Sequence, residues 1–173
     1  MKLTIEHAKK VLAIVDAGLV SGLGKPILGQ MCVEAAVCFA LGQPHSDRPA
    51  CVSSAVRSLK IGLNDAAWSS NEARTKGLRR LAIAQLGSDE SIDDKEFVKE
   101  VATMTIKVIV PIALRAAASV KKNAKHKDSL EAAAVRCEKE GTREAALAGK
   151  TAAAYAAYAA DADAVAAVDA AVY

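Results

Sequence analysis

The chain has 173 residues and a formal net charge of +3. This length suits one domain with its own core, and so small a charge gives no reason to expect a nucleic acid or a membrane as a partner. Apolar residues make up 52% of the chain but aromatic residues only 3%, which predicts a core of Ala, Val, Leu and Ile between closely spaced helices.

The N-terminal segment does not resemble a signal peptide, because Glu6, Lys9, Lys10 and Asp16 interrupt the part that would have to be apolar. The longest apolar run near mid-chain, residues 108–114, contains a proline and is shorter than a membrane span. A soluble, cytoplasmic protein is therefore expected. In that reducing compartment the four cysteines are expected to be free thiols or ligands rather than disulfides.

The apolar spacing of the first half predicts helices over residues 5–17, 31–41, 51–66 and 69–85. Thr4 is expected to cap the first of them, and Gly18 to end it. The second is apolar nearly all round, which indicates burial. In the third, the side chains expected to face inward are Val52, Val56, Leu59 and Leu63, whereas Arg57 and Lys60 are expected to face outward.

The second half predicts a helix after Asp94 that Pro111 breaks or kinks. A helix capped by Asp128 and a last helix capped by Thr142 follow. Together these elements predict an all-α fold, a compact bundle of six or seven helices. The expected domains are residues 1–150 and an alanine-rich helix over 151–173 that packs on the first domain or on a second copy.

The alanine-rich helix carries one stripe of larger side chains. Its members are Tyr155, Tyr158, Ala162, Val165 and Val168. A helix this rich in small residues is expected to pack tightly on a neighbour.

Residues 31–52 gather three of the four cysteines with a histidine and acidic residues. Glu34 and Cys38 are four residues apart and share one helix face, and the following loop returns His45 and Asp47 toward that helix. Three interpretations stay open: buried packing around a shaped turn, a metal site, and a thiol active site.

The weak candidate zinc ligands are Cys32, Cys38, His45 and Cys51. Their spacing lacks the closely spaced cysteine pair that is typical of structural zinc sites. The candidate residues of a metal- or thiol-dependent enzyme are Cys32, Glu34, His45 and Asp47. No assembled catalytic signature and no cofactor motif is visible in the sequence, so no cofactor is expected.

A second cluster surrounds the only tryptophan. Ser69 and Glu72 form a capping box, and the free amides at a helix start bind anions. With the arginines of the next turns and a stacking aromatic ring, this pattern favours a phosphate or nucleotide ligand. The candidate ligand-binding residues are Asn64, Asp65, Trp68, Ser69, Ser70, Asn71, Arg74 and Arg79. The alternative is a capped helix with a solvated basic face and Trp68 in the core.

Several segments carry a resemblance to a known family. They are Cys32-Val33-Glu34-Ala35-Ala36, the run from Gly42-Gln43-Pro44-His45 to Cys51-Val52, Asn64-Asp65, and the run from Trp68 to Ala82. These resemble a family of helical proteins found in bacteria and their phages and plasmids, and the last run is most similar to the phage-type members. The resemblance covers roughly residues 10–90. It implies a mobile-element setting and no mechanism, because no activity of the family is established.

From these features we expect a non-enzymatic binding protein of a phage or other mobile element in the cytoplasm of a bacterial host. It would sequester a small phosphorylated ligand or nucleotide, or inhibit a host defence protein. The first alternative is the enzyme centred on the cysteine cluster. The second is a structural protein whose alanine-rich tail mediates oligomerisation, and a homo-oligomer is expected in any case.

Overall fold

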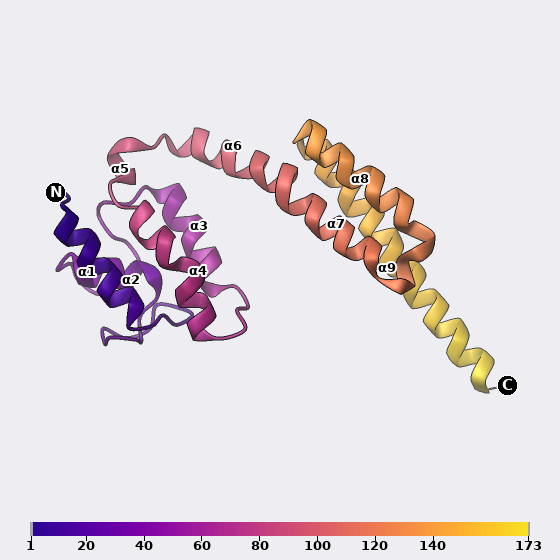
Figure 1. Ribbon diagram of the computed structural model, residues 1–173, viewed down its shortest axis with the longest axis horizontal. Helices are drawn as coiled ribbons and strands as arrows, with labels where there is room; N and C mark the ends of the chain where they lie inside the picture. The colour runs from indigo at the N-terminus through magenta and orange to yellow at the C-terminus, as the bar shows by residue number, and fades with distance from the viewer. Residues whose placement is uncertain (1, 173) are drawn as a thin grey trace. The chain divides into compact units, whose positions relative to one another are not determined.

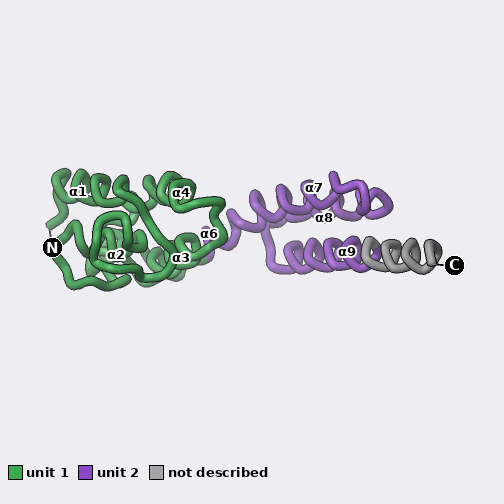
Figure 2. The backbone as a smooth tube through the Cα atoms, turned by 90° about the horizontal axis from the view of Figure 1, so that it is seen from below, with its two compact units in different colours: residues 1–98 green, residues 99–173 purple. Residues whose placement is uncertain are grey.

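The computed structural model describes residues 2–172, and the surroundings of side chains for residues 2–159. Every extended regular element in this part of the chain is a helix (Figure 1), so the prediction of an all-α fold is confirmed. The chain divides into two units, Met1–Val98 and Lys99–Tyr173 (Figure 2). The domain boundary expected at residue 151 falls inside the last helix, α9 (Arg143–Val172).

Unit 1 is built around a short buried helix. Its elements are α1 (Ile5–Asp16), α2 (Val33–Ala40), α3 (Ser54–Asp65), α4 (Asn71–Ala84) and α5 (Ser88–Ser91), and α6 (Asp94–Met104) carries the chain into unit 2. All of α2 except Phe39 is buried, because α1, α3 and α4 pack against it. The nearly continuous apolar sequence of α2 is the cause of this central position.

Polar side chains begin the helices of unit 1. Thr4 caps α1 as predicted, and its hydroxyl accepts from the amide of His7. At α2 the cap is a thiol, since Cys32 Sγ accepts from the amide of Ala35 at 3.3 Å. The predicted cap of α4 is wrong by one residue: Ser70, not Ser69, accepts from the helix amide.

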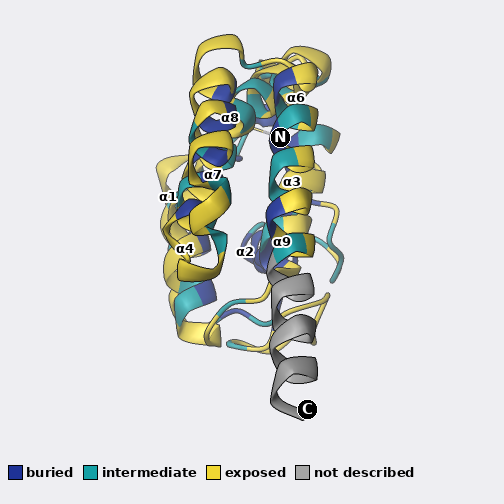
Figure 3. Cartoon of the chain, turned by 90° about the vertical axis from the view of Figure 1, so that its right-hand side faces the viewer, coloured by how far each residue is buried: buried dark blue, intermediate teal, exposed yellow. Residues whose placement is uncertain are grey.

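Unit 2 contains η1 (Thr105–Ile109), α7 (Val110–Ser119), η2 (Lys121–His126), α8 (Lys127–Glu140) and α9. Small residues let its helices approach closely: a Cβ on Gly149 of α9 would lie 3.1 Å from Leu114 of α7. The core of unit 2 includes Leu130, Ala134 and Cys137 of α8, which are buried. Figure 3 shows buried segments along this helix in dark blue. The helices of this unit thus pack largely through alanine and glycine rather than through large side chains.

The helix break expected at Pro111 does not occur. Residues 94–119 run as one helix, since a π-helical turn, Thr105–Ile109, precedes the proline. Proline has no amide hydrogen to donate to the preceding turn, and the wider turn, in which Val110 N bonds Thr105 O, accommodates it. By length and composition alone the continuous helix could cross a membrane, since its most apolar 18-residue stretch has a mean hydropathy of 1.6.

The predicted stripe of the alanine-rich helix is described only in part. Tyr155 and Tyr158 are 67% and 76% exposed, whereas the neighbouring Ala156 is buried. The side chains of Ala162, Val165 and Val168 lie outside the described residues. The inward face of α9 is therefore formed by alanine, at least up to residue 159, and its tyrosines face away from the core.

Candidate functional site

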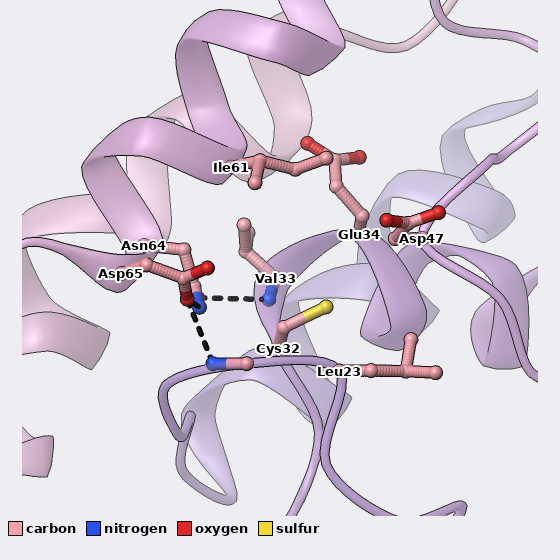
Figure 4. Close-up of a pocket in the computed structure, with 9 residues that line it drawn as sticks. Leu23, Cys32, Val33, Glu34, Asp47, Ile61, Asn64 and Asp65 are labelled. Carbon is pink, nitrogen blue, oxygen red and sulfur yellow. Dashed lines mark hydrogen bonds between the residues drawn. The ribbon is translucent and has the colours of Figure 1, made fainter.

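A small cavity of about 30 Å³ lies where α2 and α3 meet two loops of unit 1 (Figure 4). Its lining residues are Gly22, Leu23, Cys32, Val33, Glu34, Asp47, Ile61, Asn64 and Asp65. Asn64 and Asp65 lie on one side of it and Asp47 on the other. Three of the four candidate enzyme residues are thus brought together with the Asn-Asp pair from segments far apart in the sequence.

Glu34, at the edge of this cavity, forms a buried ion pair with Lys60 of α3. Lys60 Nζ lies 3.4 Å from Glu34 Oε1, and the two side chains are 2% and 1% exposed. The groups are close enough to attract one another but are not aligned as a hydrogen bond: among the described residues, neither carboxylate oxygen of Glu34 has a hydrogen-bond partner. Such a pair is a weak source of stability, because two desolvated charges cost several kcal/mol.

Burial shifts both members of the pair toward their neutral forms. It lowers the pKa of Lys60 to about 8, a shift that the charge of Glu34 opposes. It raises the pKa of Glu34 above its ordinary value, again opposed by its partner. Strongly perturbed groups beside a cavity are typical of functional sites, so this corner of unit 1 is a candidate site on physical grounds.

Arg57 and Asp47 form a second ion pair near the buried pair of Glu34 and Lys60. Arg57 Nη1 donates to Asp47 Oδ1 at 3.3 Å and so ties the loop after α2 to the start of α3. The prediction that Arg57 and Lys60 face outward is wrong for Lys60, which is buried, while Leu59 is partly exposed. The buried row of α3 is Val56, Lys60 and Asn64, because polar partners on α2 and its loops turn this face inward.

Asn64 and Asp65 hold the glycine-rich loop against α2. The amide oxygen of Asn64 accepts from Val33 N at 3.1 Å, and its nitrogen donates to Val20 O at 3.0 Å. Asp65 Oδ1 accepts from Gly22 N at 2.7 Å. These bonds satisfy loop groups that would otherwise be buried without partners. The pair was expected to bind a ligand, and here its side chains position the loop that forms the cavity wall.

The thiol of Cys32 is poorly prepared for nucleophilic chemistry in this conformation. Burial raises its pKa above the ordinary value, and a thiol rather than a thiolate is a weak nucleophile. His45, its candidate base, has Nε2 3.2 Å from the carbonyl oxygen of Gly24.

The candidate zinc ligands are not assembled as a metal site. Among the described residues, no three His, Cys, Asp or Glu side chains are placed to hold one ion. Cys38 and Cys51 are buried as free thiols, and burial raises the pKa of Cys38 to about 11. Buried, uncharged thiols of this kind pack as small apolar side chains.

A larger, open pocket of about 500 Å³ lies at the start of α4. It is lined by Asp16, Ala17, Gly18, Leu19, Gly29, Asn71, Glu72, Thr75, Lys76 and Arg79. Two candidate ligand-binding residues, Asn71 and Arg79, thus meet here, together with Lys76. Arg79 donates to both carboxylate oxygens of Asp16, at 2.6 and 3.0 Å, and this contact lowers the pKa of Asp16.

The remaining candidate ligand residues contact the protein itself. Trp68 donates from Nε1 to Leu63 O at 2.8 Å, and its ring lies against Gly77. Arg74 is buried and donates to Asn64 O and to the side chain of Asn71. Ser70 caps α4, and Ser69 is exposed in the connection before it. The two clusters of candidate residues therefore lie at two separate cavities, and Arg74 bonds Asn64 of the first and Asn71 of the second.

Comparison of the chain with models of protein families, with curated proteins and with solved structures finds no match. None of the three identifies a family for the chain. Function is therefore inferred from the geometry of the two cavities.

Proposed function

We propose that the protein is a non-enzymatic binding protein whose ligand is a small phosphorylated molecule of the nucleotide class. The ligand would occupy the open pocket at the start of α4. The observation that carries the proposal is the meeting of Asn71, Lys76 and Arg79 on one wall of a pocket large enough for such a molecule.

The donors of this wall suit a phosphate. The amides of Asn71 and Glu72 have no acceptor earlier in the helix, and the positive end of the helix dipole favours an anion there. Lys76 and Arg79 lie further along α4 and line the same pocket. A guanidinium group already held in place by Asp16 loses little freedom on binding.

The acids of the pocket favour a nucleotide over a bare polyanion. Asp16 and Glu72 line it with Lys76 and Arg79, so two negative charges balance two positive ones. A nucleotide offers phosphate oxygens to the cations and hydroxyl or amino hydrogens to the carboxylates. The proposal gives Trp68 and Arg74 no contact with the ligand, because both are engaged within the protein.

Isothermal titration with AMP, ADP and inorganic phosphate tests this function. We expect a nucleotide to bind better than phosphate, and Lys76→Ala or Arg79→Ala to weaken binding about 10- to 100-fold, as loss of a charge-assisted hydrogen bond does. Arg80→Ala is the matched control, since Arg80 is an exposed neighbour outside the pocket lining. No binding by the wild type, or an equal loss in the control, would remove the proposal.

A counter-defence role in a phage or other mobile element is the biological setting we propose for such binding. A protein that captures a phosphorylated signal lowers its free concentration without any chemistry. The resemblance of residues 32–36, 42–52 and 68–82 to proteins of phages and plasmids supports this setting, and inhibition of a host defence protein is the other form it could take. The test is to express the wild type or Arg79→Ala in infected and uninfected bacterial cells and to compare the effect of the two chains. An effect that Arg79→Ala removes indicates ligand capture, and an effect that it leaves unchanged indicates a role that does not need the pocket.

A thiol- or metal-dependent enzyme is the second candidate, because Cys32, Glu34 and Asp47 line one cavity. A cavity of about 30 Å³ has room for about one water molecule, so a substrate would require the loops of residues 21–32 and 43–49 to open. Alkylation by iodoacetamide followed by peptide mapping tests this candidate. Selective labelling of Cys32 at neutral pH, or stoichiometric zinc that Cys51→Ser removes, would favour the enzyme; neither outcome is expected from a closed, protonated thiol.

A further inference from the structure

The helix over residues 94–119 exposes a row of large apolar side chains. Met104, Val108, Ile109 and Ile112 are 59%, 44%, 58% and 61% exposed. Only 17% of the most apolar stretch of this helix is buried, which separates it from the core helix of a globular protein. Apolar surface of this extent marks an interaction site.

The two charged side chains within residues 104–119, Lys107 and Arg115, contact other segments of unit 2. Arg115 of α7 is bound by Glu131 and Glu138 of α8, at 2.9 and 2.5 Å. The stem of Lys107 lies against Gly141. Pro111, Leu114 and Ala118 form the opposite, buried face of α7. The row of Met104, Val108, Ile109 and Ile112 is therefore apolar, and the exposed polar residues of the same stretch are Thr105 and Lys107.

A basic segment begins just after the end of α7, nine residues beyond the last residue of the apolar row. Residues 121–128 contain four lysines and one aspartate, and Lys121, Lys122 and Lys127 are exposed. An apolar helix face next to clustered lysines is the combination by which helices bind the surface of anionic membranes. The apolar groups enter the acyl boundary, and the ammonium groups meet phosphate headgroups.

We propose that unit 2 binds the surface of an anionic lipid bilayer through the row from Met104 to Ile112 and the lysines of residues 121–127. The helix lies on the membrane and does not cross it. Crossing would carry the charges of Lys107, Arg115 and Glu138 into the hydrocarbon, which is costly. No membrane partner was expected from the sequence because the net charge is small and the apolar run of residues 108–114 is short; the continuous helix over residues 94–119 removes the second of these reasons.

Co-sedimentation of the full chain with lipid vesicles tests the proposal. We expect binding to vesicles of phosphatidylcholine mixed with phosphatidylglycerol and little binding to phosphatidylcholine alone. The double variant Ile109→Lys/Ile112→Lys should abolish binding. Lys121→Glu/Lys122→Glu should weaken binding to anionic vesicles by about tenfold or more. Val135→Lys, at an exposed apolar residue of α8, is the matched control and should bind as the wild type does.

Thermal melting checks that each variant keeps its fold. We expect unchanged melting temperatures, because every substituted residue is exposed. Absence of binding to both kinds of vesicle overturns the proposal, as does an equal loss in Val135→Lys. Light scattering without lipid gives the remaining outcome: a dimer that Ile109→Lys/Ile112→Lys dissociates would show that a second copy, and not lipid, covers the row.

Discussion

Lys60 Nζ lies 3.4 Å from Glu34 Oε1 between α2 and α3, and both side chains are almost fully buried. Neither group has an aligned hydrogen bond among the described residues. A charge left alone in this place would be desolvated and uncompensated. The two residues therefore depend on one another for the stability of unit 1.

This dependence predicts the result of a double-mutant cycle. Lys60→Met should lower the free energy of unfolding by about 3–5 kcal/mol, because it leaves a buried carboxylate unpaired. The double variant Glu34→Met/Lys60→Met should recover most of that loss, since similar volumes of hydrocarbon replace both charges. Urea denaturation of the wild type, Glu34→Met, Lys60→Met and the double variant completes the cycle of four chains. A double variant as unstable as Lys60→Met would show that the charges do not explain the effect.

The pKa of Lys60 predicts a pH dependence of stability. The pKa is about 8 in the folded protein and 10.5 for an ordinary lysine. Between these values the unfolded chain binds more protons than the folded one, so this group makes the free energy of unfolding rise with pH. The variant Glu34→Met/Lys60→Met lacks this lysine and its partner but keeps the other titratable groups. From pH 8 to pH 10 the free energy of unfolding should therefore rise more in the wild type than in this variant. A difference between the two chains that stays constant from pH 8 to pH 10 would contradict the assignment.

The loop that forms the cavity wall should loosen when Asn64 is replaced. Asn64→Leu leaves Val33 N and Val20 O without their partners, at about 1–3 kcal/mol for each buried group. Hydrogen exchange should become faster at the amides of Val33 and Gly22. Ser58→Ala, at an exposed position of the same helix, is the control. Unchanged exchange in Asn64→Leu would mean that the loop is held by other contacts.

Two glycines in helices should respond oppositely to alanine. A Cβ on Gly77 would lie 2.3 Å from the ring of Trp68, whereas a Cβ on Gly62 meets no atom within 4 Å. Gly62→Ala should stabilise the protein by about 0.5–1 kcal/mol through helix propensity. Gly77→Ala should destabilise it by about 1–3 kcal/mol and displace the ring. Fluorescence of the single tryptophan reports this directly, and an emission spectrum unchanged in Gly77→Ala would refute the contact.

The four longer helices α1 to α4 could be predicted from sequence because local signals determine them, whereas the short helix α5 was not predicted. Thr4 and the apolar spacing of α1 are sufficient for that helix, and the apolar run of α2 indicates its burial. The orientation of α3 could not be predicted, since hydrophobicity favours Leu59 as a core residue over Lys60. Only the position of Glu34 in three dimensions explains why a lysine is buried there.

The candidate sites could be predicted only in part, because local spacing is visible in the sequence and tertiary contacts are not. Helix geometry predicts that Glu34 and Cys38 share a face of α2, and the loop length predicts the return of Asp47, but the bond from Arg57 to Asp47 is a tertiary contact that the sequence does not reveal. At α4 the basic residues were apparent, whereas the partners that engage Arg74 and Arg79 lie on other segments. Lys76 gains its place beside the pocket from the packing of α1 on α4. Pairing between distant side chains is the information that a single sequence lacks.

The most direct test of the proposed function is a titration of the isotopically labelled protein with ADP, followed by amide NMR shifts. If the pocket at the start of α4 binds the nucleotide, the amides of residues 71–76 and of Gly18 and Gly29 should shift in proportion to occupancy, and Arg79→Ala should abolish the change. Shifts confined to the amides around Cys32 and Glu34, or none at all, would contradict the proposal.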